Sequence, residues 1–502
     1  MQAEPLTIDL ADLAATTRLA EDLALALRPG DCICLSGDLG AGKSTFARAV
    51  IRAIADDMDL EAPSPTFTLV QSYALRLPLA HIDLYRIGSP EEIEELGLED
   101  ALSGGSALIE WPERALDALP ETRVMMRFEG LGAARTVKIS GPEEFVDRLN
   151  RSLDARHFMD QAGYPAAVRR HLQGDASSRT YESVRAPDRD PVILMDSPHR
   201  PDGAPIRDGL PYSRIAHLAE DVTPFVAISG WLREQGFAAP AVLAQDLEAG
   251  FLLVEHLGTA GVLDERNAPD PLRYQIAIDC LAALHATEPP RTLQVEDRAH
   301  HVPAYDARAM QIEVELLTDW YLPWRRGSDV PASERQAYLD HWQALFFKLE
   351  TAENALVLRD YHSPNLIWRD ERAGLDRLGL IDFQDAMIGP SAYDVASLCQ
   401  DARVTVSNDL ATDLLARYVA ARRGQDENFD ETAFYETYAI MAAQRATKIL
   451  GIFVRLNQRD GKPGYLRHLP RLETYLARSL QHPALHPLRS WFAKAGIGQI
   501  ES

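Results

Sequence analysis

Short apolar runs and amphipathic stretches alternate along the first third of the chain, a pattern typical of strands and helices that follow one another. Leu19, Leu23 and Leu27 recur at a spacing of four residues, which predicts a helix. Two more helices are predicted over Thr45–Ala55 and Glu91–Leu102. The strands that we expect between them are Cys32–Leu35, Phe67–Tyr73, Leu79–Ile82, Ala107–Ile109 and Arg135–Ile139, and residues Leu6–Leu10 precede the first helix. The alternation predicts a compact α/β domain with a mostly parallel sheet over residues 1–150.

The pattern changes after residue 154. Strands are predicted over Thr180–Val184, Pro191–Met195, Ala241–Leu243 and Gly250–Val254, and short helices over Phe158–Ala167 and Pro224–Gln235. Farther along, the apolar positions predict the long helices Leu272–His285, Asp306–Leu322 and Pro331–Glu350. A β-rich lobe over residues 155–257 followed by a helical lobe over residues 258–502 is the layout of a two-lobed, protein-kinase-like α+β domain.

Composition narrows the class of protein. The 502 residues are too many for one ordinary core, and no apolar run is long enough to span a membrane. The first residues carry no secretory signal, and the four cysteines lack the spacing of a disulfide framework or a zinc site, so we expect a cytoplasmic protein. A net charge of −24 argues against direct, non-specific binding of nucleic acid.

One stretch of the first domain carries a nucleotide-binding motif. Residues 37–45 read GDLGAGKST and fit G-x-x-x-x-G-K-[ST], with a predicted strand before them and a predicted helix after them. In such a loop, backbone N–H groups surround the phosphates, Lys43 reaches the β- and γ-phosphates, and Ser44 holds Mg²⁺. The residues predicted to bind ATP here are Gly37, Asp38, Gly40, Ala41, Gly42, Lys43, Ser44 and Thr45.

A P-loop also needs an acid that completes the Mg²⁺ site or positions the attacking water. Asp83 and Glu110 each end a short apolar run, where the tip of a buried strand would face the phosphates. The pattern of residues alone leaves both as candidates.

Four motifs of this domain resemble the TsaE family in order and spacing: residues 37–45, 64–70 (SPTFTLV), 81–86 (HIDLYR) and 110–114 (EWPER). The resemblance covers residues 1 to about 140. It implies a small ATPase that supports threonylcarbamoyl transfer to tRNA adenosine together with TsaB- and TsaD-like proteins. It also implies that Glu110 is the second Mg²⁺ residue, that Asp83 is a catalytic carboxylate beside Glu110, and that Thr66 and Arg135 approach the nucleotide.

A second constellation lies in the C-terminal half, where residues 358–368 read LRDYHSPNLIW. Transfer of a phosphoryl group to a hydroxyl needs a carboxylate that accepts the proton and ligands for Mg²⁺. Asp360 precedes Asn365 at the spacing that kinases use for base and metal-binding asparagine, and Asp382 follows a predicted buried strand. A hairpin of Leu366–Arg369 and Leu378–Ile381 would bring Asn365 and Asp382 to the same end.

These motifs, with residues 389–394 (GPSAYD), resemble the aminoglycoside phosphotransferase family, and in particular its branch of AmgK-type anomeric sugar kinases. The resemblance spans residues 155–500 and implies ATP-dependent phosphorylation of the C1 hydroxyl of N-acetylmuramate or N-acetylglucosamine in peptidoglycan recycling. It implies adenine contacts from Glu255 and Leu257, and substrate contacts from His362 and Asp385. Asp394 is expected to hold the catalytic loop.

The sequence departs from the kinase pattern at one point, because no lysine lies between Lys138 and Lys348. The cation for the α/β-phosphates must then be Arg179 or Arg185, or the backbone amides of Gly174–Arg179, Ser177 among them, must suffice. Two alternatives stay open: another hydroxyl substrate such as an aminoglycoside or a choline-like amino alcohol, or a non-catalytic ATP-binding scaffold. A muramate substrate would favour an arginine for its lactyl carboxylate, for which Arg325 and Arg326 are candidates.

Overall fold

The computed structural model describes residues 4–88, 92–130, 134–172, 179–199 and 202–497. The chain divides into two compact units, Met1–Asp196 and Ser197–Ser502. Of the described helices, none is both long and apolar enough to cross a membrane.

The first unit is built on a seven-stranded sheet in the order β1-β7-β6-β2-β5-β4-β3. Its strands are β1 (Leu6–Leu10), β2 (Cys32–Ser36), β3 (Val70–Tyr73), β4 (Leu79–Asp83), β5 (Ser106–Glu110), β6 (Val124–Glu129) and β7 (Arg135–Ser140). The central strands β6, β2, β5 and β4 are parallel, and the outer pairs are antiparallel. Because Leu35 lies opposite Glu110, the loop that follows β2 and the end of β5 share one edge of the sheet.

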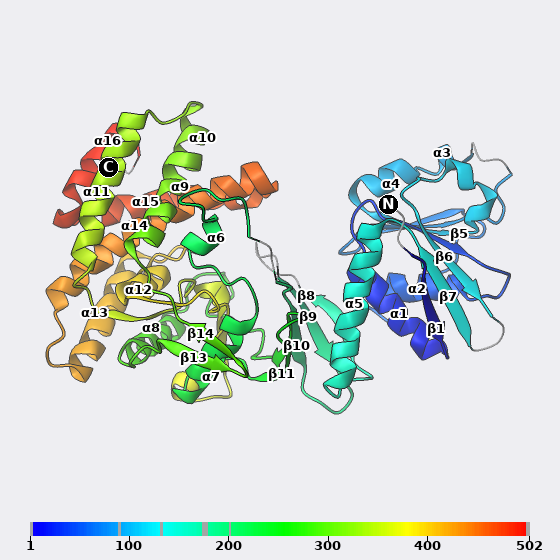
Figure 1. Ribbon diagram of the computed structural model, residues 1–502, viewed down its shortest axis with the longest axis horizontal. Helices are drawn as coiled ribbons and strands as arrows, with labels where there is room; N and C mark the ends of the chain where they lie inside the picture. Colours follow the sequence, from blue (N-terminus) through cyan, green and yellow to red (C-terminus); the bar gives the residue numbers. More distant parts are fainter. Residues whose placement is uncertain (1–3, 89–91, 131–133, 173–178, 200–201, 498–502) are drawn as a thin grey trace. The chain divides into compact units, whose positions relative to one another are not determined.

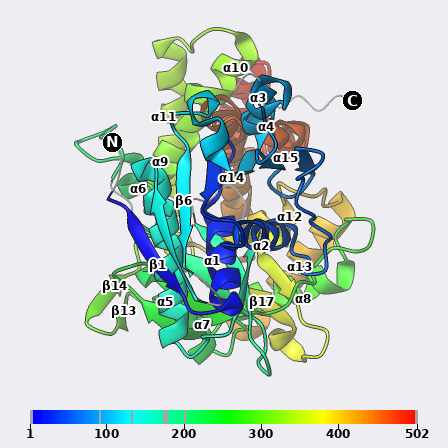
Figure 2. The same cartoon turned by 90° about the vertical axis from the view of Figure 1, so that its right-hand side faces the viewer.

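Helices cover both faces of this sheet (Figure 1). The helices α1 (Leu13–Ala26), α2 (Lys43–Ala55) and α5 (Glu143–Gln161) pack on one face, around a core that includes Leu23, Phe46 and Leu149. The short helices α3 (Glu92–Glu95) and α4 (Leu98–Gly104) cover the other face, against Cys32 and Ile109. Figure 2 shows β1 at an edge of the sheet, and α1 packs against α2.

Two elements of the first unit differ from the prediction. Strand β6 was not predicted, although its buried and exposed residues alternate as in a half-buried strand. The short helix expected over Phe158–Ala167 is instead the last turn of α5, whose 19 residues run through residues 150–155. The division of the chain into domains at those residues stays a prediction.

The first unit also contains an antiparallel meander of β8 (Val168–Leu172), β9 (Thr180–Arg185) and β10 (Val192–Asp196). Buried ion pairs join this meander to α1 and α5. Asp22 of α1 accepts hydrogen bonds from Arg156 of α5 at 2.7 Å and from Arg169 of β8 at 2.8 Å, and Arg169 also pairs with Glu182 of β9 at 2.7 Å. Strands β8 and β9 are therefore fixed to the face of α1 that points away from the central sheet's core.

The second unit is mainly helical. Its elements are α6 (Tyr212–Ile215), α7 (Thr223–Glu234), β11 (Val242–Asp246), β12 (Phe251–Glu255), α8 (Pro271–His285), β13 (Thr292–Val295), β14 (Arg298–His301), α9 (Ala307–Leu316), α10 (Leu322–Arg326), α11 (Ala332–Leu349), β15 (Asn354–Val357), β16 (Leu366–Trp368), β17 (Leu378–Leu380), β18 (Met387–Pro390), α12 (Ala392–Cys399), α13 (Asn408–Gln425), α14 (Glu431–Asp460), α15 (Leu469–Ser479) and α16 (His486–Lys494). The helix expected over Asp306–Leu322 is divided by a π-helical turn at Leu317–Tyr321.

Helix α14 is the centre of this unit and packs against α9, α12 and α15. It approaches α9 so closely that a Cβ atom at Gly451 would lie 2.4 Å from the backbone of Leu316. The predicted hairpin is confirmed, because β16 and β17 pair antiparallel with Leu366 opposite Leu380. It brings Asn365 and Ile381 to the same end, where the amide of Ile381 donates to the carbonyl of Asn365 at 3.1 Å.

Candidate active sites

The loop between β2 and α2 has the backbone that its glycines permit. Gly37, Gly40 and Gly42 have φ angles of +136°, +80° and +104°, which residues with a Cβ rarely adopt. Lys43 begins α2 and turns its ammonium group back toward the loop, donating to the carbonyls of Gly37 at 2.6 Å and Asp38 at 3.0 Å. A cationic side chain and the N-terminus of a helix thus meet in one loop, which is the arrangement that binds phosphates.

Glu110 joins the end of β5 to this loop. Its Oε2 accepts a hydrogen bond from the Ser44 hydroxyl at 2.7 Å, and its Oε1 lies 2.9 Å from Nε2 of His81 on β4. Glu110 is only 1% exposed, and each of its carboxylate oxygens is held in place by one of these two partners. Sequence reasoning quoted His81 within a motif but gave it no role. The available signal was its alternation with Asp83, which puts both side chains on the same face of β4.

Asp83 lies at the end of the neighbouring strand and contacts the Ser-Pro-Thr loop. Its Oδ2 accepts hydrogen bonds from Thr66 at 2.9 Å and Ser64 at 3.2 Å, and its Oδ1 accepts from the amide of Tyr85 at 3.0 Å. Since β4 and β5 pair with Asp83 opposite Glu110, the two predicted acids lie side by side at the sheet edge that carries the P-loop.

Burial and charge act on Lys43 in opposite directions. Burial lowers its pKa, while the carboxylates of Glu110, Glu113, Asp83 and Asp38 raise it, and the net shift is downward. The ammonium group also lies 3.7 Å from the ring centroid of Trp111, which packs against the core that includes Cys32 and Ile109. This contact, with the two loop carbonyls, compensates part of the lost hydration.

Arg135 of β7 lies against the same loop. A Cβ atom at Gly42 would be only 2.9 Å from its Nε. The structure therefore brings together six of the predicted first-site residues: Lys43, Ser44, Thr66, Asp83, Glu110 and Arg135.

In the second unit, the predicted catalytic loop follows β15. The carboxylate of Asp394 accepts hydrogen bonds from the backbone amides of Leu358 at 2.6 Å and Arg359 at 3.0 Å. Arg359 has a φ of +68°, an angle uncommon for a residue with a side chain, and these bonds stabilise it. Burial raises the pKa of Asp394 to about 7, and the two amide hydrogen bonds and Arg445 oppose that rise.

The loop brings the three predicted kinase residues together. The side-chain amide of Asn365 donates to the carbonyl of Asp360 at 2.9 Å and to Oδ2 of Asp382 at 3.2 Å. Gln384 donates to Oδ1 of Asp382 at 2.9 Å. The pKa of Asp360 is lowered, because the charges of His362, Lys448, Arg445 and Arg359 outweigh its burial. An ionised carboxylate is the form that accepts a proton from a hydroxyl.

Sequence reasoning missed a set of buried charges behind this loop. Glu313 of α9 is fully buried and accepts hydrogen bonds from Arg359 at 2.5 Å, Lys448 at 2.8 Å and Gln444 at 2.9 Å. Lys448 and Gln444 belong to α14, so three elements meet at one carboxylate. No local pattern marks such residues, because they lie more than forty positions apart.

The remaining predicted residues lie at varied places in the second unit. His362 is nearly buried, with Nδ1 4.0 Å from Asp401, and Asp385 accepts from the amide of Ala219 at 2.7 Å. Glu255 accepts from Arg233 at 3.2 Å, and Leu257 is packed against Gly379. Whether these residues contact adenine or substrate stays a prediction.

Arg325 and Arg326, the two arginines suggested for a muramate carboxylate, already have acidic partners. Arg325 pairs with Glu473 at 2.6 Å, and Arg326 with Glu334 at 2.7 Å. Of the residues considered for the α/β-phosphates, Arg179 and Arg185 belong to the first unit, whereas Ser177 lies outside the described residues.

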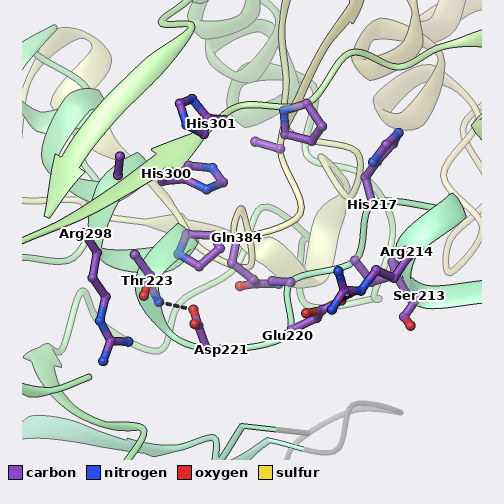
Figure 3. A pocket seen from close by; sticks show the side chains of 16 residues that line it. Ser213, Arg214, His217, Glu220, Asp221, Thr223, Arg298, His300, His301 and Gln384 are labelled. Carbon is purple, nitrogen blue, oxygen red and sulfur yellow. Dashed lines mark hydrogen bonds and ion pairs between the residues drawn. The ribbon is translucent and has the colours of Figure 1, made fainter. Parts of the chain in front are cut away.

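A pocket of about 400 Å³ adjoins the Asp382 segment within the second unit. Figure 3 shows Arg214, His217, Arg298 and His300 around it, with Gln384 at its wall. Since Gln384 is bonded to Asp382, the pocket borders the residues predicted to hold the metal.

Both sites contain oxygen ligands of the kind that Mg²⁺ prefers. Ser44 and Glu110 supply a hydroxyl and a carboxylate at the P-loop, and Asn365 and Asp382 supply an amide oxygen and a carboxylate at the second site. Mg²⁺ is commonly held by one or two carboxylates together with substrate phosphates, so each donor set fits it.

Comparisons with known proteins separate the same two parts of the chain. Residues 10–137 match the family model "Threonylcarbamoyl adenosine biosynthesis protein TsaE", and residues 168–435 match the "Phosphotransferase enzyme family". The expected fold class, a P-loop domain followed by a kinase-like α+β domain, is thereby confirmed.

Relatives of each part are also found. An N-acetylmuramate/N-acetylglucosamine kinase of Caulobacter vibrioides is 37% identical over 346 residues, which are 67% of this chain and 94% of the relative. The tRNA threonylcarbamoyladenosine biosynthesis proteins TsaE of Rickettsia conorii and Rickettsia bellii are 44% and 45% identical over 117 and 106 residues. These matches are 23% and 21% of this chain, which spans 66% and 73% of the two relatives.

Proposed function

The chain belongs to two families, the TsaE family over residues 10–137 and the phosphotransferase enzyme family over residues 168–435, and we propose that it is a bifunctional protein with two separate ATP-consuming sites. The first site supports formation of threonylcarbamoyladenosine in tRNA. The second phosphorylates the anomeric C1 hydroxyl of N-acetylmuramate and N-acetylglucosamine. One observation carries the proposal: Asp83 and Glu110 lie together beside the P-loop, and Asp382 lies against Asn365 of the catalytic loop.

At the first site, the P-loop amides and Lys43 bind the phosphates of ATP. When ATP arrives, Lys43 exchanges the carbonyls of Gly37 and Asp38 for phosphate oxygens. Mg²⁺ bound by Ser44 and Glu110 would neutralise the charge that develops on the phosphates. Asp83 is placed beside them to orient the attacking water, and its bonds to Ser64 and Thr66 make its orientation depend on the Ser-Pro-Thr loop.

At the second site, Asp360 accepts the proton of the acceptor hydroxyl as the oxygen attacks the γ-phosphorus. The positive charges of Lys448, Arg445 and Arg359 keep Asp360 ionised and ready for this step, whereas burial lowers the pKa of His362 and favours its neutral form. Asn365 and Asp382 would hold Mg²⁺, which would neutralise charge on the phosphates, and Asp394 keeps the loop in position through the amides of Leu358 and Arg359. The bond between the γ-phosphorus and the ADP oxygen breaks as the bond to the sugar oxygen forms, ADP leaves, and the hydroxyl proton stays on Asp360.

The two activities require different partners. The first needs TsaB- and TsaD-like proteins, because the TsaE family supports a modification enzyme rather than acting on tRNA alone. The second needs only ATP and an amino sugar. Both fit a cytoplasmic protein, since both consume ATP.

Two single substitutions in the full-length chain test the proposal. Lys43→Ala should abolish support of tRNA modification in a reconstituted system with TsaB- and TsaD-like proteins, while sugar phosphorylation stays within twofold of the unchanged protein. Asp360→Ala should do the reverse. Loss of both activities in either variant would contradict separate sites.

A substrate panel tests the chemistry of the second site. N-acetylmuramate and N-acetylglucosamine should be phosphorylated, with an acid-labile C1 phosphate as product, and choline and aminoglycosides should not. Turnover of choline or an aminoglycoside alone would replace the sugar assignment. Absence of turnover together with absent Mg²⁺-dependent ATP binding in Lys43→Ala protein would favour a scaffold.

A further inference from the structure

Arg445, in the middle of α14, is a buried arginine without a polar partner. Only 4% of the residue is exposed, and its Nε is buried without a hydrogen-bond acceptor. Within the described part of the chain, its guanidinium forms neither a hydrogen bond nor an ion pair; its nearest defined contact is the ring of Tyr393, 5.9 Å from centroid to guanidinium carbon. A guanidinium stays charged at every accessible pH, so it keeps its need for an anion.

The other cations around it have partners. Lys448, one turn later on α14, pairs with Glu313 at 2.8 Å and donates to the Tyr393 hydroxyl at 3.2 Å. Arg359 pairs with the same Glu313 and donates to the carbonyl of Ala216 at 3.0 Å. Glu313 accepts from Arg359, Lys448, Gln444 and the Tyr305 hydroxyl, so its acceptor positions are occupied by groups other than Arg445. Burial of an unpaired charge costs free energy. This cost suggests that a bound anion pairs with Arg445 during turnover.

The position of Arg445 points to the acceptor side of the second site. Its guanidinium lies over the ring of Tyr393, and the next residue, Asp394, holds the amides of Leu358 and Arg359, so Arg445 lies behind the catalytic loop. In agreement with this place, its charge acts to lower the pKa values of Asp360, His362 and Asp394. Asp394 already accepts two backbone amides. The two arginines suggested from sequence for an acidic sugar are neutralised by Glu473 and Glu334. The guanidinium of Arg445 thus has no anionic partner among the described residues, and it can bind an acidic group of the acceptor.

We propose that Arg445 binds the carboxylate of an acidic acceptor sugar while the C1 hydroxyl of that sugar lies at Asp360. The inference rests on the proposed sugar kinase function and identifies the residue that distinguishes the two acceptors. N-acetylmuramate carries a lactyl carboxylate, and N-acetylglucosamine carries none. The planar guanidinium matches a carboxylate with two parallel hydrogen bonds, a geometry that lysine does not offer.

The experiment compares both sugars with the full-length protein and its Arg445→Gln variant. We expect kcat/KM for N-acetylmuramate to fall by about tenfold to a hundredfold, the effect of losing a charge-assisted hydrogen bond. For N-acetylglucosamine, which has no carboxylate, the fall should be at least about fivefold smaller, because this sugar loses only the contribution of Arg445 to the ionisation of Asp360. Arg445→Lys keeps the charge but not the fork, so it should show a smaller loss with the same preference. Arg459→Gln, at the exposed end of the same helix, should change neither value.

Each other outcome has a definite meaning. An equal loss for both sugars in both Arg445 variants would assign the residue to the phosphoryl group or to the base, and would overturn the inference. Unchanged values for both sugars would also overturn it. If the unchanged protein phosphorylated neither sugar, the proposed function would fail first and the inference with it. Thermal unfolding of each variant separates a local effect from loss of the fold, and Arg445→Lys serves if Arg445→Gln does not fold.

Discussion

At the scale of single residues, the two sites depend on groups that work only in their folded surroundings. Glu313 is an example, since a fully buried carboxylate would ordinarily be protonated. Burial raises the pKa of Glu313, but the charges of Lys448 and Arg359 lower it by a larger amount, and the resulting pKa is about 2. The anion in turn holds Arg359, and through it the catalytic loop, against α9 and α14.

Glu313→Gln should destabilise the protein by about 3–5 kcal/mol, because two buried cations lose their anion. The folded-state pKa lies below the usual 4.5, so this contribution is fully present above pH 4.5 and is lost as the pH falls from there toward 2. Urea unfolding from pH 3 to pH 8 measures it. The difference between the two proteins should be constant above pH 5 and shrink below 4.5; a difference that grew on acidification would contradict the assignment.

Gly42→Ala should weaken ATP binding at the P-loop at least about tenfold, since the φ of +104° is strained for alanine and the new Cβ would lie 2.9 Å from Arg135. The matched control is Gly40→Ala, whose φ is +80° but whose Cβ would meet nothing within 4 Å. Binding of a fluorescent ATP analogue is measured in protein that also carries Asp382→Asn, which removes a predicted Mg²⁺ ligand of the second site, so that the signal reports mainly the P-loop. Equal effects of both substitutions would mean that backbone strain alone, and not the approach of Arg135, weakens ATP binding.

The residues of each site that form a motif could be predicted from the sequence, because the chemistry fixes their spacing. Lys43 and Ser44, and likewise Asp360 and Asn365, are of this kind. Residues that act through contacts between distant elements could not be predicted. His81 meets Glu110 across two strands, and Arg445 lies beside the catalytic loop only because α14 passes behind it.

At the scale of elements, α1 is the helix that connects the central sheet to the β8–β10 meander. Its inner face packs against α2 and α5, while Asp22, which is 1% exposed, pairs with Arg156 and Arg169. Arg170 of β8 additionally pairs with Asp56, the residue that ends the P-loop helix. Strands at the start of the kinase-like sequence are thus bonded to helices of the P-loop domain.

Asp22→Asn should cost about 1–3 kcal/mol of unfolding free energy, because Arg156 and Arg169 lose their shared anion but keep Glu21 and Glu182. The control is Asp9→Asn at the surface of β1, which keeps an acceptor oxygen for the Thr136 hydroxyl and should change stability by at most about 1 kcal/mol. Chemical denaturation measures both. A loss below 1 kcal/mol for Asp22→Asn would show that the network contributes little.

The prediction of elements failed where amphipathicity was weak. The apolar residues of α5 are separated by many charged ones. The sequence pattern therefore predicted a domain boundary and a short helix where the structure has one helix of 19 residues. Its helical face became apparent only with Phe145 and Leu149 against the sheet. Elements with strong periodicity or buried runs, such as α2, β2 and the β16–β17 hairpin, were predicted within a few residues.

At the scale of the whole molecule, a fragment that contains the P-loop domain alone has to include α5 in order to fold. A fragment that ends at residue 141 lacks Phe145, Val146 and Leu149, three nearly inaccessible side chains of the first core. It should therefore unfold at a much lower temperature than a fragment of residues 1–162, since each buried side chain contributes about 1.5–3 kcal/mol. Circular dichroism during heating compares the two; equal melting temperatures would show that α5 is dispensable for the P-loop domain.

The pairing of Asp22 with Arg156 and Arg169 also sets an order of events on the ribosome. The carboxylate is made 134 and 147 residues before its two partners. At roughly 5–20 residues per second, the first unit waits on the order of ten seconds for those arginines to be synthesised. During that interval α1 carries a carboxylate that has nothing to pair with inside a core, so the P-loop domain reaches its final packing only after synthesis of the kinase-like part has begun.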